Sequence, residues 1–415
     1  MHEGASRMPA LFGLVVELPP PVKLAHPRSP RRIRLLEKQQ KFLERRSASI
    51  RRAMATRSAS TQSLSSEMPS ALPQFLRQDR STLIHNFNYL ENDQRDRLSE
   101  QHDNPEQESE WARLTGNDIA IRNRYINVEP FANNRIKLAV AEGYNDYINA
   151  SPIALGPRRY IATQGPKNTS TSQFYRMLAQ ETGSNTPAVV VMLTQTHEAG
   201  REKCFKYFPD DPEIPLELHP DPEIDDGFEG KVELLSVEED SISRCAIRHL
   251  NLRYKSAKAA EDQDDGEDWK EKEIYHLLFV GWPDFSVPEG ENRNAMLKLI
   301  TRSADLSKPP NVPTSAEFPP ALEPTSEPLA SPRIIHCSAG VGRSGTFIAL
   351  DFLLAHLERG NLDSVPDDVD PIFDTVNAMR RQRMMMVQSE AQFLFLYDVM
   401  RLAWLEHHRA ADAEP

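Results

Sequence analysis

A cysteine and an arginine six residues apart lie in the most informative stretch of the sequence, Arg333–Phe347, which reads RIIHCSAGVGRSGTF. An apolar strand is predicted to run into Cys337, a turn of glycines and small residues follows, and a helix is expected from about Arg343. Such a turn can point successive backbone N–H groups into one concavity, which suits a phosphate dianion. The stretch therefore predicts a phosphate-binding loop made of Ser338, Ala339, Gly340, Val341 and Gly342.

Three side chains of this stretch have a chemical role there. The field of the loop favours a thiolate over a thiol, so we expect Cys337 to be a nucleophile at neutral pH. Arg343 can fork two hydrogen bonds to phosphate oxygens, where a lysine would offer only a point charge. Ser344 can donate its hydroxyl to the sulfur and so stabilise the thiolate when a phosphocysteine breaks down. A Walker-type nucleotide loop is excluded because no lysine follows the glycines.

Residues His336–Thr346 resemble the signature HCSAGxGRSGT of the cysteine-dependent protein tyrosine phosphatases at every specified position. The resemblance implies a classical, non-receptor, fungal-type intracellular member that hydrolyses phosphotyrosine in proteins. It implies His336 as a supporting residue behind the nucleophile. It also implies that no metal and no organic cofactor is needed.

The proposed chemistry needs a general acid, because a phenolate leaves reluctantly without a proton. Residues Trp282–Glu289, WPDFSVPE, resemble the mobile acid loop WPDxxxPE of the family. The resemblance implies Asp284 as the acid in the first step and as the base in the second. It implies Trp282 as the residue that anchors the hinge of this loop.

Two further segments resemble parts of the family that recognise the substrate and brace the site. Asn123–Phe131 is similar to the loop NRYxDVxPxD, in which Tyr125 stacks on the substrate ring and sets the depth of the pocket. Asn127 stands where the family usually has an aspartate that holds the substrate's backbone. The resemblance also implies that Glu198 braces the signature arginine and that Lys203 lies near the acid loop.

The segment Gln388–Phe395, QSEAQFLF, resembles the family's QTxxQYxF motif. The resemblance implies that Gln388 positions the hydrolytic water. Gln392 is a second candidate contact to the substrate. Because the spacing Ser389-x-x-Gln392 also forms a capping box, Gln392 is expected to take part in capping a helix.

The elements that must position these residues describe one α/β domain. Period-two and wholly apolar runs predict strands, and helical spacing predicts helices around them. The sequence predicts a twisted mixed sheet flanked by helices, with the phosphate-binding loop between a strand and a helix N-terminus. The predicted strands are 147–151, 159–163, 188–193, 232–237, 245–254, 274–280 and 333–337, and the predicted helices are 75–98, 173–181, 292–304, 344–359, 371–381 and 390–408.

Composition divides the 415 residues into unequal parts. Residues 1–71 form a basic segment rich in arginine, serine and proline, for which disorder is expected. The catalytic domain is predicted over 72–408 and a short tail over 409–415. Acidic or proline-rich stretches at about 209–230, 259–273 and 307–332 are predicted to be surface insertions.

Charge and cysteine content exclude several classes of protein. Residues 1–70 carry +8 of a total net charge of −12, so the rest carries −20, which argues against nucleic-acid binding by the folded part. The three cysteines form no CxxC pair, which excludes a disulfide scaffold and a structural zinc site. No apolar run is long enough to span a membrane. We expect a cytoplasmic protein, with a nuclear location left open.

The expected partners are phosphotyrosine-containing proteins and regulatory kinases acting on serines that follow basic residues in the segment 1–71. Two alternatives remain. A dual-specificity phosphatase shares the chemistry but has a shallower pocket, against which Tyr125 argues. A phosphotyrosine-binding pseudophosphatase would require loss of the nucleophile, the acid or the arginine, and all three are present.

Overall fold

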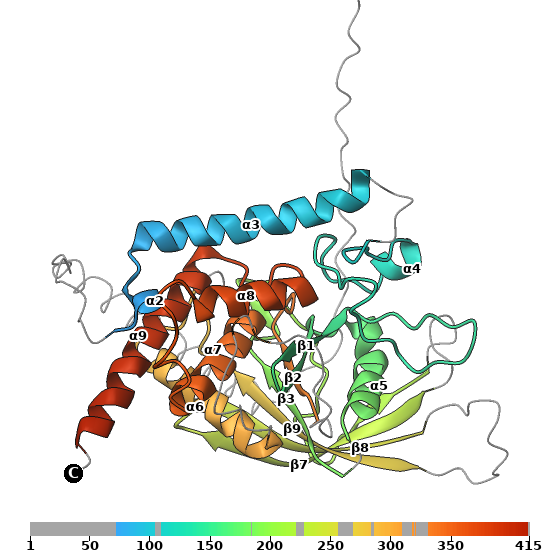
Figure 1. The fold of residues 1–415 in the computed structure, drawn as a ribbon. Coiled ribbons are helices and arrows are strands. Elements are labelled where there is room, and N and C mark those ends of the chain that lie inside the picture. The colour runs from blue at the N-terminus through green and yellow to red at the C-terminus, as the bar shows by residue number, and fades with distance from the viewer. Residues whose placement is uncertain are drawn as a thin grey trace, which may run out of the picture. The chain divides into compact units, whose positions relative to one another are not determined.

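A computed structural model of the chain describes residues 72–103, 109–183, 185–220, 228–255, 269–283, 286–308, 318, 320 and 331–413 (Figure 1). The predicted basic segment 1–71, parts of all three predicted insertions and Asp284 lie outside these residues. The described residues fall within one of the two units of the chain, Met68–Pro415. No helix among them combines the length and the apolar character that a membrane span requires.

Within the described residues, eight strands form a mixed sheet in the order β1-β2-β10-β3-β9-β8-β7-β6 (Figure 1). Strand β10 runs parallel to both of its neighbours, β2 and β3, and β3 runs parallel to β9, whereas the outer pairs are antiparallel. The strands are β1 Ala150–Leu155, β2 Arg158–Thr163, β3 Ala188–Met192, β6 Leu216–Leu218, β7 Glu229–Asp240, β8 Cys245–Lys255, β9 Lys270–Phe279 and β10 Arg333–His336, and β4 His197–Glu198 pairs separately with β5 Arg201–Glu202.

Helices cover both faces of this sheet, and alternate residues of its central strands point to each side. Val189 and Val191 of β3 belong to one buried cluster, and Val190 and Met192 to another, as the period of a strand requires. The first cluster lies beneath most of the helices and the second beneath α5 Thr171–Glu181. The other helices are α2 Gln74–Arg77, α3 Arg80–Asp103, α4 Asn117–Ala120, α6 Glu291–Ser307, α7 Gly342–Glu358, α8 Pro371–Gln382 and α9 Glu390–Ala413, with a 3₁₀ turn at Asn168–Ser170.

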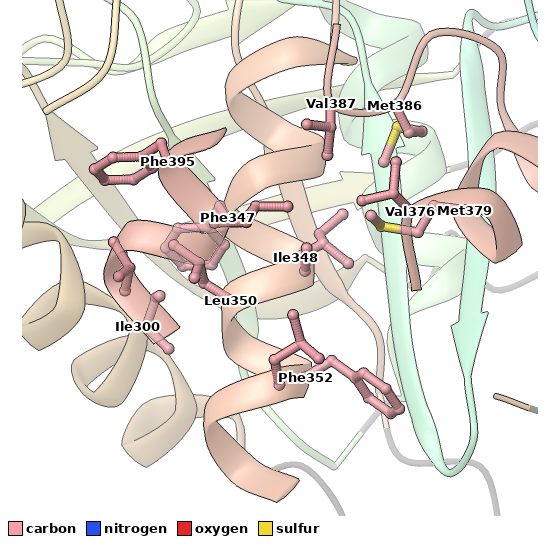
Figure 2. Close-up of a cluster of buried hydrophobic side chains, with 14 of the residues drawn as sticks. Ile300, Phe347, Ile348, Leu350, Phe352, Val376, Met379, Met386, Val387 and Phe395 are labelled. Carbon is pink, nitrogen blue, oxygen red and sulfur yellow. The ribbon is translucent and has the colours of Figure 1, made fainter. Parts of the chain in front are cut away.

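Helix α7, which begins at the predicted phosphate-binding loop, is enclosed by other elements. Figure 2 shows Phe347 and Ile348 of α7 among side chains from α6, α8, α9 and the segment before α9. Nearly every residue of α7 is buried, from Gly342 to Leu357. A helix packed on all sides cannot shift without opening the core, so the loop at its N-terminus has a fixed base.

A buried ionic cluster further fixes α7 to the sheet. Asp351 of α7 accepts hydrogen bonds from Arg158, at 2.9 Å, and from Arg333 and Tyr160. Burial raises the pKa of the Asp351 carboxyl, but Arg333 and Arg158 outweigh it and hold the pKa below its usual range. The cluster ties α7 to β2 and β10, the strands beside the loop.

The predicted α/β fold is confirmed, but several elements differ from the prediction, and β9 already begins at Lys270, inside the predicted insertion 259–273. The first strand occupies 150–155 rather than the predicted 147–151, because its backbone ladder with β2 begins at Ala150, and Tyr147 forms only an isolated bridge to Lys137. The segment 209–230 was predicted to be a surface insertion. In the structure this segment contributes edge strand β6, and Phe228 is buried in the core.

Replacement of Asp351 tests the buried cluster. Asp351→Asn should lower the free energy of unfolding by about 3–5 kcal/mol, because two buried guanidinium groups lose their counter-charge. Since the folded-state pKa is depressed, the carboxylate stabilises the wild type fully above its unfolded pKa of about 4 and ceases to do so as the pH falls through the folded value. Urea unfolding at several pH values, followed by circular dichroism, measures the loss of stability and its dependence on pH. The exposed Asp305→Asn is the control, and equal stability of the two variants would contradict the prediction.

Candidate active site

The predicted phosphate-binding loop lies where the chain leaves β10 and enters α7. This is the carboxyl end of the central parallel strands, the edge at which open α/β sheets bind ligands. Gly340 has φ of +72°, and a Cβ there would lie 2.0 Å from the carbonyl oxygen of Thr163. Only glycine fits this position, both for its backbone conformation and for the space available.

The surrounding structure engages every backbone carbonyl of the loop. The donors to the carbonyls of residues 337 to 342 are, in order, His336 Nδ1, Gly165 N, Arg383 Nη2, Arg383 Nε, Gly345 N together with Val387 N, and Thr346 Oγ1, all between 2.9 and 3.2 Å. The backbone N–H groups of residues 338–341 donate to no backbone carbonyl of the described residues. They are therefore left for the sulfur and for an anion inside the loop.

Cys337 is 5% exposed, at the base of this loop. Burial raises the pKa of its thiol, but the guanidinium of Arg343, the hydroxyl of Ser344 and the N–H groups of Ser344 and Gly340 together lower the pKa below its ordinary value. Cys204 and Cys245 are also free and buried, and burial raises the pKa of both, that of Cys245 to about 11. Cys337 is thus the thiol whose surroundings favour ionisation.

Arg343 is held by a carboxylate from a different part of the chain. Its Nη1 and Nη2 donate to the two oxygens of Glu198 at 2.6 and 2.7 Å, and Nη1 also donates to Leu193 O at 3.0 Å. Burial raises the pKa of Glu198, but the bonds from Arg343, Thr194 and the backbone of Gln195 lower it overall. Glu198 stays ionised, and it fixes the plane of the guanidinium beside the loop.

Tyr125 is anchored to the loop at the other side. Its hydroxyl is 2.8 Å from Ser338 Oγ, which in turn donates to the carbonyl of Lys203 at 2.8 Å. The ring is half-buried against the core, while Asn127 is exposed. The structure thus holds Tyr125 beside the phosphate-binding loop.

The segment before α9 meets the loop from a third direction. A Cβ at Gly342 would lie within 3.0 Å of the Gln392 amide and 3.3 Å from Gln388 Cβ, so both glutamines lie against the loop. Gln392 Oε1 accepts from Ser389 N, and Ser389 Oγ accepts from Gln392 N, which confirms the predicted capping box. Gln388 itself is exposed.

His336 lies behind the nucleophile in a chain of buried hydrogen bonds. Its Nε2 is 2.6 Å from the Tyr207 hydroxyl, which is 3.0 Å from His276 Nε2. Burial lowers the pKa of His336 to about 4, so the ring is neutral at pH 7. A neutral ring with Nδ1 protonated donates to the Cys337 carbonyl and accepts from Tyr207, which fixes one tautomer.

The remaining predicted residues are placed only in part. Trp282 is buried and donates through Nε1 to Ser286 O at 2.9 Å, across the segment predicted to carry the acid. Asp284 lies outside the described residues. Lys203 is buried, and its carbonyl takes part in the chain to Tyr125. No cluster of three or more potential metal ligands occurs in the part of the chain that the structure describes.

Sequence reasoning missed Arg383. This fully buried side chain donates to the carbonyls of Ala339 and Gly340, and also to Asn149 Oδ1 at 2.7 Å and Ser151 Oγ at 3.1 Å. Burial lowers its pKa to about 10, which leaves it charged at pH 7. The sequence shows an arginine just past the predicted helix 371–381. It does not show which groups this arginine binds, because its partners are 40 or more residues away in sequence.

The surroundings of Cys337 predict how its reactivity varies with pH. Ser344→Ala removes a hydroxyl that lowers the thiol pKa, so the midpoint of the alkylation rate against pH should move to higher pH. The rate of carboxymethylation at Cys337, followed by peptide mass spectrometry, measures this. Cys204 and Cys245 are internal controls that should react slowly in both proteins. A midpoint that stays in place would contradict the effect of this hydroxyl on the thiol.

Comparisons with known proteins agree with this arrangement. The profile of the protein-tyrosine phosphatase family matches residues 120–401. The chain is 34% identical over 297 residues to Tyrosine-protein phosphatase 2 of Schizosaccharomyces pombe, which covers 70% of this chain and 35% of the relative. It is 31% identical over 287 residues to Receptor-type tyrosine-protein phosphatase C of Mus musculus, which covers 67% of this chain and 18% of the relative.

The chain therefore spans about a third or less of the length of these curated relatives. A solved structure of PTPN18 in complex with HER2-pY1196 phospho-peptides has a TM-score of 0.58 and 23% identity, and it covers 80% of this chain and 98% of that one. At this identity the likeness shows a shared fold. Since the profile match spans more than half of the chain and the yeast relative aligns with more than two thirds of it, the chain belongs to the classical protein tyrosine phosphatase family.

Proposed function

We propose that this protein is a protein tyrosine phosphatase, which hydrolyses phosphotyrosine in proteins through a phosphocysteine intermediate. The observation that carries the proposal is the pairing of Cys337 with Arg343 on one loop. The thiol has a lowered pKa, and the guanidinium is oriented by two hydrogen bonds to Glu198. A preformed nucleophile and a preformed phosphate ligand at one helix N-terminus suit phosphoryl transfer.

In the first step, Cys337 Sγ attacks phosphorus in line with the tyrosyl oxygen. The S–P bond forms as the P–O bond breaks, and Asp284 gives its proton to the departing phenol oxygen. Arg343 and the loop N–H groups bind the equatorial oxygens throughout. Because the phosphoryl group already carries its charge, the rate depends on positioning and electrostatic stabilisation.

In the second step, water attacks the phosphocysteine and the S–P bond breaks. Asp284, now a carboxylate, takes the proton of the water, and Gln388 positions the water against phosphorus. The Ser344 hydroxyl stabilises the sulfur as it leaves as a thiolate. The products are inorganic phosphate and the enzyme, in which Cys337 is again a thiolate and Asp284 again carries a proton.

Selectivity for tyrosine follows from the depth of the site. Cys337 is buried at the base of the loop, and Tyr125 is anchored to Ser338 beside it. A phosphoserine side chain is shorter, and its backbone would meet the wall before phosphorus reached the sulfur. This favours a tyrosine phosphatase over the dual-specificity alternative, and the presence of Cys337, Arg343 and Asp284 favours an active enzyme over a binding scaffold.

We further propose a non-receptor, fungal-type role in intracellular signalling, with the protein in the cytoplasm and a nuclear location left open. The absence of a disulfide pattern in the sequence supports a reducing compartment. PTPN18, whose solved structure shares this fold, was solved in complex with HER2-pY1196 phospho-peptides, which supports phosphotyrosine proteins as the substrate class. The basic segment 1–71 is a proposed site for regulatory kinases.

Loss of the nucleophile or of the acid should separate binding from turnover. Cys337→Ser should reduce turnover of p-nitrophenyl phosphate by about a thousandfold or more, because a hydroxyl stays protonated where the thiol ionises. Asp284→Ala keeps the thiol that binds and attacks the phosphate but lacks the acid. It should therefore hold phosphotyrosine proteins long enough to be captured with them from a lysate of the native cell. Residual turnover within tenfold of wild type in Cys337→Ser would refute the mechanism.

The depth of the site predicts a strong preference for phosphotyrosine. Ring stacking on Tyr125 contributes about 0.5–1.5 kcal/mol, or roughly tenfold at most, so depth must supply the rest. We expect kcat/KM on phosphotyrosine peptides to exceed that on matched phosphoserine peptides by more than about a hundredfold. Asn127→Asp should lower KM for the peptides more than for p-nitrophenyl phosphate, since a carboxylate accepts a backbone N–H more strongly. Comparable kcat/KM values on both peptides would favour the dual-specificity alternative.

A further inference from the structure

Helix α3 is connected to the segment that carries Gln388 through three of its residues, one directly and two by way of α8. Phe87, Glu91 and Gln94 are spaced four and three residues apart, so they share one face of the helix. Figure 1 shows α3 lying along α8 and α9, on the outside of the helical layer. The domain's chemistry, as proposed above, makes no use of this helix.

Two of these residues contact Arg380 of α8. Glu91 Oε1 is 2.8 Å from Arg380 Nη1, and the Phe87 ring centroid is 5.3 Å from its Cζ. Arg380 is fully buried, and burial lowers its pKa while Glu91 opposes that shift. Glu91 is therefore the carboxylate that offsets the cost of this buried charge.

Arg380 and Gln94 between them engage three successive backbone groups ahead of Gln388. Gln94 Oε1 accepts from Met385 N at 2.7 Å. Arg380 donates through Nε to the carbonyl of Met386 at 3.0 Å and through Nη2 to that of Val387 at 2.9 Å. All three bonds depend on side chains that α3 supplies or neutralises.

The segment to which these side chains bind, residues 385–387, has unfavourable backbone dihedral angles. Met385 has φ of +60° and Val387 has φ of +58°, which L-residues rarely adopt and β-branched residues least of all. Such a conformation persists only where the surroundings impose it. Without the partners from α3 and Arg380, the segment would relax toward ordinary dihedral angles and Gln388 would move with it.

The same segment touches the phosphate-binding loop directly. Val387 N donates to Val341 O at 3.2 Å, and a Cβ at Gly345 would lie 2.5 Å from Val387 N. The position of Gln388 relative to the loop is thus set by the backbone of residues 385–387.

We propose that α3 is a positioning element for the hydrolysis of the phosphocysteine. Phe87, Glu91 and Gln94 act through Arg380 and Met385 to keep Gln388 against the phosphate-binding loop, and none of them touches the substrate. The inference rests on the proposed function, in which Gln388 positions the attacking water. It predicts that α3 affects the second chemical step and leaves the first unchanged.

The reason for this selectivity is the division of residues between the steps. Formation of the phosphocysteine uses Cys337, Arg343 and Asp284. Arg343 is oriented by hydrogen bonds to Glu198 and Leu193, which belong to other parts of the chain than α3. Since kcat/KM reports events up to release of the aryl group, it should not change when only hydrolysis slows. Slower hydrolysis lowers kcat and KM together.

The test uses the full chain with the substitutions Glu91→Gln and Gln94→Met, separately and combined. Rapid mixing with p-nitrophenyl phosphate measures the burst of p-nitrophenol. The phosphocysteine is followed separately, with a substrate that carries a radioactive phosphoryl group, by denaturing the enzyme at successive times and counting the label that stays bound. We expect this decay to slow about three- to tenfold in each single variant. The steady-state fraction of phosphorylated enzyme should rise, and kcat/KM should stay within about twofold of wild type. Asp96→Asn is the matched control, because it removes one charge from an exposed position of the same helix.

The outcomes separate this inference from the proposed function. An active wild type whose variants retain normal phosphocysteine decay would overturn the role of α3 alone. Equal losses of kcat and kcat/KM would also overturn it, because they would indicate general damage to the site. A wild type that forms no phosphocysteine would overturn the proposed function, and this inference with it.

Discussion

The fold of this domain depends on one constraint, that a tight loop must turn its backbone N–H groups inward around an anion. Each carbonyl then faces the protein and needs a donor, because a buried unpaired carbonyl costs about as much as a lost hydrogen bond. The donors come from the end of β10, the segment after β2, the turn after α8, the segment before α9 and the first turn of α7. Residues from across the chain thus converge on six carbonyl groups.

A second constraint is electrostatic. Burial of Cys337 opposes ionisation, and the net lowering of its pKa shows that Arg343, Ser344 and the loop amides outweigh burial. The arginine is itself buried and needs Glu198 to offset its charge, while Arg383 carries a further buried charge behind the loop. Buried charges of this kind are unfavourable unless they are paired and bonded, so the same contacts that orient the site also make it tolerable.

The structure assigns the two sides of the loop to different supports. The Glu198 side holds the arginine, and the side facing α8 and α9 holds the segment of Gln388 through backbone conformations with positive φ. Gln94 of α3 binds Met385, and Arg380 of α8, which is paired with Glu91 of α3, binds Val387. Separate supports allow one chemical step to be adjusted without changing the other.

The sequence by itself determined the chemistry and the class of fold. Cys337, Arg343 and the glycines between them lie close together in the chain, so their spacing alone predicts a loop that binds an oxyanion, and the apolar runs around them predict strands and helices. The bounds of the first strand and the edge strand β6 were not predictable, because backbone pairing with β2 and with β7 decides them. Only the tertiary structure revealed Arg383, Arg380 and Glu91. Arg383 binds groups 43 to 234 residues away, and the carboxylate that pairs with Arg380 comes from Glu91, nearly 300 residues earlier, so a pattern along the chain cannot show these partners.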